Sequence, residues 1–279
     1  ASAAPALSPL SGLGDFVLIA DDERRQAATM AMAEAFEDQT AWPRLGDINA
    51  PIERIELWPG AVLLARGVGT VQTAGRAGAW LLSVDTPHRR EAEAVAQGWL
   101  QGRRIDMSSA SARFVLVLWD GETRELALVT DGFRTYPVVY ALPDNNGQTM
   151  IAASDLRLLR VAYEWPYVGG KPRALTMNPQ AVYHYLNFSF VPNEACIWQQ
   201  AHKLAPGSTA RWQAGKAMPT VKTWWDARYP EDNPDDDTRR AAELRQLILD
   251  SVRRYGQAPA RNWGTFLSGG TDSSSISGI

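Results

Sequence analysis

Short apolar runs and helical patterns alternate in the first third of the chain. Residues 16–20 (FVLIA) are apolar throughout, which predicts a buried strand. Asp21 and Asp22 can cap a helix over 23–37, where apolar residues recur at helical spacing. Similar patterns predict three more strands at 52–57, 61–65 and 80–84 and a second helix at roughly 90–101.

Paired strands dominate the middle of the chain. Residues 113–119 and 124–130 flank Asp120-Gly121, which is a strong hairpin-turn signal. The runs 136–142 and 149–153 predict a second antiparallel pair, and a short helix follows at 155–160. Because strands are paired and helices are kept apart, the pattern favours an α+β sandwich over alternating βαβ units.

The remaining sequence predicts a change of domain. Residues 166–234 are irregular and marked by prolines, with a helix near 179–186. The acidic stretch 230–238 (PEDNPDDDT) is typical of a linker, and a helix from 238 to about 255 would open a new domain. That helix is expected to turn apolar residues inward: Ala242, Leu244, Leu247, Ile248 and Val252. We expect a flexible arm at 1–14, a first domain at 15–165, a bridging segment with linker at 166–235 and the beginning of a second domain at 236–279.

Composition limits the functional classes. The 279 residues are 45% hydrophobic and 21% charged with a net charge of −3, which is typical of a soluble globular protein. No basic patch predicts nucleic-acid binding, and no apolar run approaches the roughly 18 residues of a membrane span. The single cysteine, Cys196, allows no internal disulfide and fits a reducing compartment such as the cytoplasm. Three scattered histidines form no zinc pattern, and the eleven tryptophans are expected to serve packing.

The last residues carry the clearest chemistry. An apolar run, 263–267, predicts a strand that leads into a glycine turn and a new helix. Glycine lets an anion approach backbone amides, and the start of a helix favours negative charge. The candidate ATP or pyrophosphate site is therefore Ser268, Gly269, Gly270, Thr271, Asp272, Ser273 and Ser274. Asp272 would hold Mg²⁺ that bridges phosphates. The turn lacks a Walker A lysine, so it suits attack at the α-phosphorus with pyrophosphate leaving; the alternative is a serine- and glycine-rich tail.

These residues resemble a known family. SGGTDSS is similar to the pyrophosphate-binding PP-loop of asparagine synthetases, and 113–159 resembles the second half of a class II glutamine amidotransferase domain. The motifs Thr130-Asp131, Pro137 and Ala153-Ser154-Asp155 fall at places comparable to the family's. Residues 183–212 resemble its bridging segment. The resemblance implies an Ntn-type sandwich flanked by helices, then the first helix and strand of an α/β PP-loop domain, with ATP and Mg²⁺ as cofactors.

The glutaminase half departs from the family's pattern. In the family, the nucleophile is an N-terminal cysteine. This chain begins with Ala1, and its one cysteine, Cys196, has apolar neighbours and is expected to be a small buried residue. The family's Asn-Gly oxyanion motif should fall near 82–86, where the sequence has none. Arg66 is the candidate for gripping glutamine's carboxylate. We therefore expect an inactive glutaminase with no nucleophile; an N-terminal serine exposed by processing, Ser2 or Ser8, is the weaker alternative, since neither precedes the expected glycine motif.

The resemblance then implies an ATP-dependent amide ligase that adenylates a carboxylate and joins it to an amine from a source other than glutamine. The first candidate is peptide macrolactam formation, as in lasso peptide cyclases. A β-lactam synthetase-like enzyme, an ammonia-using asparagine synthetase homologue, and a non-catalytic module that binds a precursor peptide or partner subunit remain open. Because 263–267 suits burial on both faces, we expect the chain to be the first part of a longer ligase and to be inactive alone.

Overall fold

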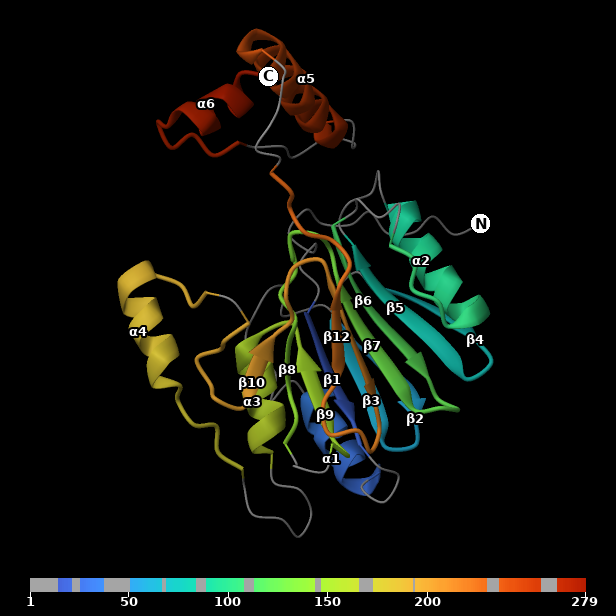
Figure 1. Cartoon of the computed structure of the whole chain (residues 1–279). Coiled ribbons are helices and arrows are strands. Elements are labelled where there is room, and N and C mark those ends of the chain that lie inside the picture. Colours follow the sequence, from blue (N-terminus) through green and yellow to red (C-terminus); the bar gives the residue numbers. More distant parts are fainter. Residues whose placement is uncertain are drawn as a thin grey trace. The chain divides into compact units, whose positions relative to one another are not determined.

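The computed structural model divides the chain into two compact units, Ala1–Asp226 and Ala227–Ile279, which are described separately (Figure 1). It describes residues 15–21, 26–37, 51–66, 69–83, 89–107, 113–143, 147–165, 173–192, 194–229, 236–256 and 265–279. The expected arm at 1–14 and most of the expected linker, 230–235, lie outside these ranges.

The first unit contains two antiparallel six-stranded sheets. In sheet A the strands lie in the order β10 (Ala201–Lys203), β8 (Val139–Ala141), β9 (Met150–Ala153), β1 (Asp15–Ala20), β3 (Ala61–Arg66) and β2 (Ile52–Trp58). In sheet B the strands lie in the order β12 (Thr220–Thr223), β11 (Ser208–Gln213), β7 (Glu125–Thr130), β6 (Phe114–Asp120), β5 (Ala77–Ser83) and β4 (Gly69–Ala74). The α+β sandwich expected from the sequence is confirmed.

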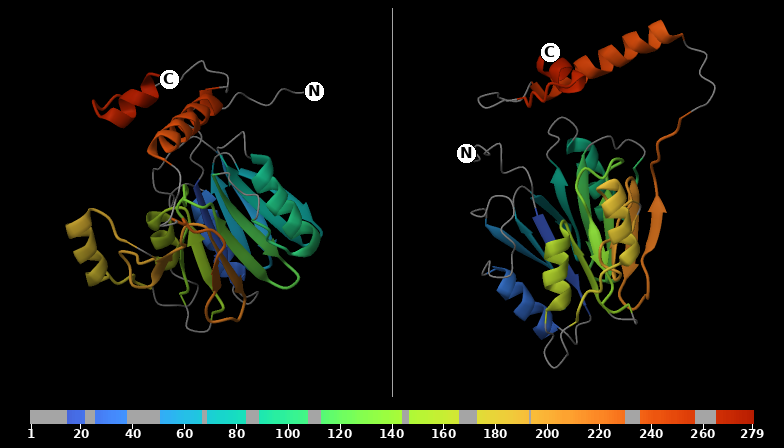
Figure 2. Two further views of the ribbon diagram at one scale, coloured as in Figure 1. Left: turned by 45° about the horizontal axis from the view of Figure 1, so that its top comes forward. Right: turned by 90° about the vertical axis from the view of Figure 1, so that its left-hand side faces the viewer.

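Helices cover the outer faces of both sheets (Figures 1 and 2). Helices α1 (Gln26–Glu37) and α3 (Leu156–Glu164) pack on sheet A, and α2 (Arg89–Gly102) packs on sheet B. Strand β1 is therefore buried on both sides: Phe16 and Leu18 join the core between the sheets, and Val17 and Ile19 face the helices. This double burial explains why FVLIA is apolar without alternation.

The predicted strands and helices of this unit form with shifted ends, and four strands were missed: β4 and the three strands of the bridging segment, β10, β11 and β12. Strand β4 has the sequence GTVQTA and is an edge strand whose residues are half-buried or exposed, so it carries no apolar run. The β6–β7 hairpin pairs Asp120 with Glu125, and its turn holds Arg124 at φ 53°. Strand β8 is shorter than the predicted run 136–142, and it pairs with β9 as expected.

The expected bridging segment supplies strands to both sheets. Strand β10 pairs with β8 in sheet A, and β11 pairs with β7 in sheet B. Helix α4 (Pro179–Phe188) begins after Asn178, whose side chain accepts from the amides of Gln180 and Ala181. Ala181 is the one residue of α4 that is fully buried.

The second unit holds α5 (Asp237–Gly256) and α6 (Thr271–Ser277). The predicted strand 263–267 is wrong where it can be checked: 265–267 form no strand and Phe266 is 96% exposed, while 263–264 lie outside the described ranges. The inward face predicted for α5 is also wrong, because Leu244, Leu247 and Ile248 are exposed. Both corrections have one reason: among the residues described here, this unit offers no strand to pair with and only α6 to pack against.

Within the described ranges, no helix is both long and apolar enough to cross a membrane.

Candidate functional site

One end of the sandwich gathers polar side chains where β1 begins and β3 and β9 end. Asp15 pairs with Arg66 in the register of β1 and β3. The Ser154 hydroxyl accepts from the Phe16 amide at 3.0 Å and donates to Asp15 Oδ1 at 3.2 Å. Asp155 caps α3 through the Arg157 amide. The sequence singled out Arg66, Ser154 and Asp155, and the fold brings them together with Asp15, which was missed; we call Asp15, Arg66, Ser154, Asp155 and Arg157 the β1-start cluster.

The cluster places ionisable groups in a partly dry environment. Burial raises the pKa of Asp15, and the nearby charge of Asp155 raises it further, while the Ser154 hydrogen bond and the charges of Arg66 and Arg157 oppose the shift. Burial acts on Asp155 in the same direction, but hydrogen bonds from Arg157 bring the pKa of Asp155 below its usual value. Arg66 is only 4% exposed. The arrangement places two carboxylates and a hydroxyl near a buried guanidinium.

The predicted motif Thr130-Asp131 organises the neighbouring turn. The Asp131 carboxylate accepts from the amides of Phe114, Phe133 and Thr135 at 3.2, 2.9 and 3.1 Å. The Thr130 hydroxyl donates to the Ala205 carbonyl at 2.8 Å. The Asp131 carbonyl accepts from the Gly207 amide. The Asp131 side chain holds the turn after β7, and the Thr130 side chain holds the loop before β11. The motif therefore has a structural role here.

Cys196 lies away from the start of β1. It is 2% exposed and belongs to the apolar cluster on the outer face of sheet A, which confirms the prediction of a buried residue. Burial raises the pKa of its thiol to about 11. Of the predicted oxyanion region, Leu82 is buried and Ser83 ends β5, whereas 84–88 fall outside the described chain, as do Ala1, Ser2 and Ser8.

The glycine turn of the second unit has the local form that the sequence predicts. Gly269 has φ 83° and Gly270 is the N-cap of α6, with no side chain bonded at that cap. The first helical bond runs from the Ser274 amide to the Gly270 carbonyl. The hydroxyls of Ser268 and Ser273 are 2.9 Å apart, which ties the two sides of the turn together.

Asp272 lies in the first turn of α6. The structure thus brings Ser268, Gly269, Gly270, Thr271, Asp272, Ser273 and Ser274 into one compact turn, and all but the half-buried Ser273 are exposed. Among the residues that could be described, no group of three or more His, Cys, Asp or Glu side chains is arranged to hold a metal ion.

Comparison with known proteins identifies relatives of the first unit. Residues 91–225 match the glutamine amidotransferase domain family. The chain is 28% identical over 192 residues to putative glutamine-hydrolyzing asparagine synthetases of Mycobacterium bovis and Mycobacterium tuberculosis, covering 68% of this chain and 28% of theirs. It is 26% identical over 169 residues to asparagine synthetase 1 of Bacillus subtilis, covering 61% of this chain and 24% of that protein.

The alignments therefore span about a quarter of the length of these relatives. A solved structure described as the allosteric regulatory enzyme of purine biosynthesis aligns with 76% of this chain and 49% of its own at 9% identity, but its TM-score of 0.35 supports no conclusion. The chain is thus similar to a glutamine amidotransferase domain over 91–225, and its curated relatives are asparagine synthetases at 26–28% identity.

Proposed function

We propose that the full-length protein is an ATP-dependent, AMP-forming amide ligase of the asparagine synthetase family that takes its amine from a source other than glutamine. The family matches support the ligase class, and SGGTDSS supports nucleotide activation. ATP supplies the adenylate that makes a carboxylate reactive, and Mg²⁺ neutralises phosphate charge.

The position of Cys196 is the observation that carries the second half of this proposal. A class II glutaminase needs a thiol beside the α-amine at the start of its first strand. Cys196 is the only cysteine in the sequence, and it is buried against the outer face of sheet A beside β10, three positions from β1 in the strand order. With a pKa of about 11, roughly one molecule in ten thousand carries the thiolate at pH 7. Such a thiol cannot supply the thioester step.

The residues of the glycine turn fit a pyrophosphate group. The first amides of a helix have no intrahelical partner, and no side chain bonds at the Gly270 cap. Thr271, Asp272 and Ser273 can therefore present their amides to phosphate oxygens. Asp272 would hold the Mg²⁺ ion that accompanies ATP. The Ser268–Ser273 hydrogen bond keeps the turn closed before ligand arrives.

For the substrate, we propose a peptide whose amine closes a macrolactam on an Asp or Glu side chain, as in lasso peptide cyclases. A β-lactam synthetase-like or ammonia-using asparagine synthetase activity is the alternative within the ligase class. A second kind of function, binding of a precursor peptide or partner subunit, is favoured by an exposed apolar surface on and beside α4. Its members are 54–77% exposed: Met177, Tyr183, Tyr185, Leu186, Phe188 and Phe190.

The experiment uses the full-length gene product with ATP, Mg²⁺ and a precursor peptide encoded beside its gene. We expect AMP and a dehydrated peptide. Asp272→Asn should lower the rate of AMP formation about 100-fold, because the metal loses a charged ligand. Asp250→Asn on α5 is the matched control and should leave the rate unchanged. Peptide dehydration with ADP as product would contradict adenylation, and binding of the peptide without any turnover would favour the binding module.

A further inference from the structure

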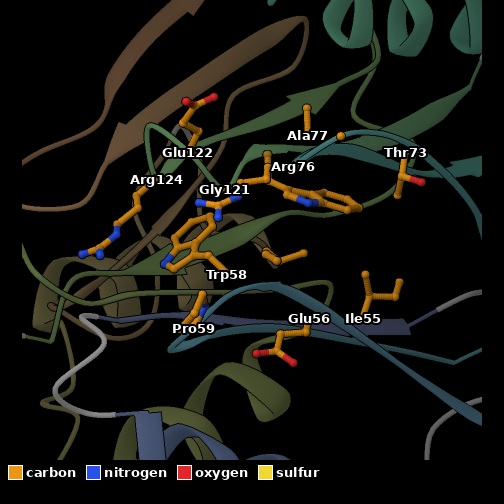
Figure 3. Close-up of a pocket in the computed structure, with 13 residues that line it drawn as sticks. Ile55, Glu56, Trp58, Pro59, Thr73, Arg76, Ala77, Gly121, Glu122 and Arg124 are labelled. Atoms are coloured by element: carbon orange, nitrogen blue, oxygen red, sulfur yellow. The ribbon is translucent and has the colours of Figure 1, made fainter.

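We propose that a cavity at the opposite end of the sandwich binds a free α-amino acid with an apolar side chain. The cavity has a volume of about 520 Å³, which lies in the usual range for small-molecule sites (Figure 3). It is lined by the end of β2, by the β4–β5 turn and by the β6–β7 turn. These segments belong to both sheets, and they lie at the strand ends opposite Asp15 and Arg66.

Backbone contacts fix the shape of this cavity. The Gly121 amide donates to the Arg76 carbonyl at 2.9 Å, which joins the two turns of sheet B. A Cβ atom at Gly121 would lie 2.8 Å from the Leu57 carbonyl oxygen, so the turn touches the end of β2 in sheet A. The site is therefore formed before any ligand arrives, and little ordering is needed on binding.

The floor of the cavity is apolar and aromatic. Leu57, Trp58 and Trp119 line it and are 5%, 3% and 3% exposed. The Trp58 indole N–H donates to the Asp21 carbonyl at 3.4 Å, which holds the ring in place. Ile55 and Pro59 extend the same surface. An aliphatic or aromatic side chain of a ligand would be taken out of water here.

The rim carries charges of both signs that are not neutralised by one another. Arg76, Glu56 and Glu122 are exposed, and over the described ranges none of these three side chains forms an ion pair. The half-buried Arg124 adds a second guanidinium to the lining. In the view of Figure 3, Glu122 and Glu56 lie on opposite sides of Arg76 and Trp58. Arg76 can take a carboxylate while either Glu takes an ammonium group.

This combination selects a zwitterion. A simple anion would face two carboxylates, and a simple cation would face the two guanidinium groups of Arg76 and Arg124. A purely apolar molecule would cover the floor but would remove water from these charged groups and offer them no polar partner. A free amino acid offers both charges next to one apolar group. The inference rests on these residues alone and does not depend on the ligase activity proposed above.

The test is an NMR titration of the 279-residue chain with L-phenylalanine as the probe. We expect the indole N–H signals of Trp58 and Trp119, among the eleven tryptophans, to shift with a Kd on the order of 1 mM, because the charges are exposed. N-acetyl-L-phenylalanine lacks the ammonium group and L-phenylalanine amide lacks the carboxylate. Each should bind at least about fivefold more weakly. Equal binding of all three, or no shift of either indole at about 20 mM, would overturn the proposal.

Charge-removing variants give an independent readout. Arg76→Gln should weaken L-phenylalanine binding about threefold to fivefold, and so should Glu56→Gln or Glu122→Gln, whichever carboxylate takes the ammonium. Arg90→Gln on α2 and Glu53→Gln on β2 are exposed, matched controls outside the cavity and should bind as the parent does. Unchanged thermal midpoints confirm that each variant folds. Parent-like affinity in all three rim variants would overturn the assignment.

Discussion

Replacing Asp131 with alanine tests whether this residue holds the turn after β7. The parent carboxylate is 2% exposed and accepts from three backbone amides and from the Thr135 hydroxyl. The Phe114 amide would be left buried without this acceptor, which costs about 2–3 kcal/mol. The amides of Phe133 and Thr135 lie in a more exposed turn, where water can replace part of each bond, so each adds about 0.5–1 kcal/mol. The expected loss of unfolding free energy is therefore about 3–5 kcal/mol.

Urea unfolding followed by tryptophan fluorescence measures this loss. Asp131→Asn keeps one carbonyl acceptor but turns an amide toward the other donors, so it should cost about half as much as Asp131→Ala. Glu53→Gln makes the same chemical change at an exposed position and should cost less than about 0.5 kcal/mol. A loss below about 1 kcal/mol for Asp131→Ala, with an unchanged urea dependence, would refute a structural role for Asp131.

Three further predictions concern single residues of the first unit. Burial raises the pKa of the Asp15 carboxyl above 3.8, so the contribution of Asp15 to the free energy of unfolding is complete below that pH and falls as the pH rises through the raised pKa. Asp15→Asn should remove this fall in urea unfolding measured between about pH 3.5 and 7. Equal pH profiles for the parent and the variant would argue against a raised pKa. Cys196 should react with iodoacetamide roughly 100-fold more slowly than an unhindered cysteine at pH 8, and rapid alkylation of the native protein would show that its burial is wrong. Gly78→Ala places a methyl group 1.9 Å from the Trp119 ring and should cost about 3 kcal/mol in thermal or urea unfolding; a cost near zero would mean that the ring is free to move.

Much of the sandwich could be predicted because double burial leaves a strong trace in the sequence. Strands β1 and β6 are covered on both faces and are apolar throughout, and the β6–β7 hairpin carries a glycine at its turn. Strand β4 could not be found in this way. It lies at an edge, where half-exposed polar residues satisfy a strand as well as apolar ones do.

The second unit shows the opposite case. The run 263–267 is apolar enough for a buried strand, yet Phe266 and Leu267 are exposed where they are described. A strand is stabilised by a neighbour, and a sequence pattern cannot state whether that neighbour is present. The same limit applies to α5, whose apolar face is regular but exposed.

The functional residues divide along similar lines. Arg66, Ser154 and Asp155 were found through resemblance, and the fold then places them together. Asp15 was missed because one acidic residue before an apolar run looks like an ordinary strand boundary. The cavity around Trp58 and Trp119 has no local sequence pattern at all, since three separate turns form it.

The most direct test of the central claim measures AMP and glutamate in one reaction. The full-length protein is incubated with ATP, Mg²⁺, L-glutamine and the peptide substrate, and both products are quantified against a reaction without protein. The expected result is one AMP per amide bond formed and no glutamate above the blank. Glutamate released in step with AMP would show a working glutaminase and would contradict the proposed source of the amine.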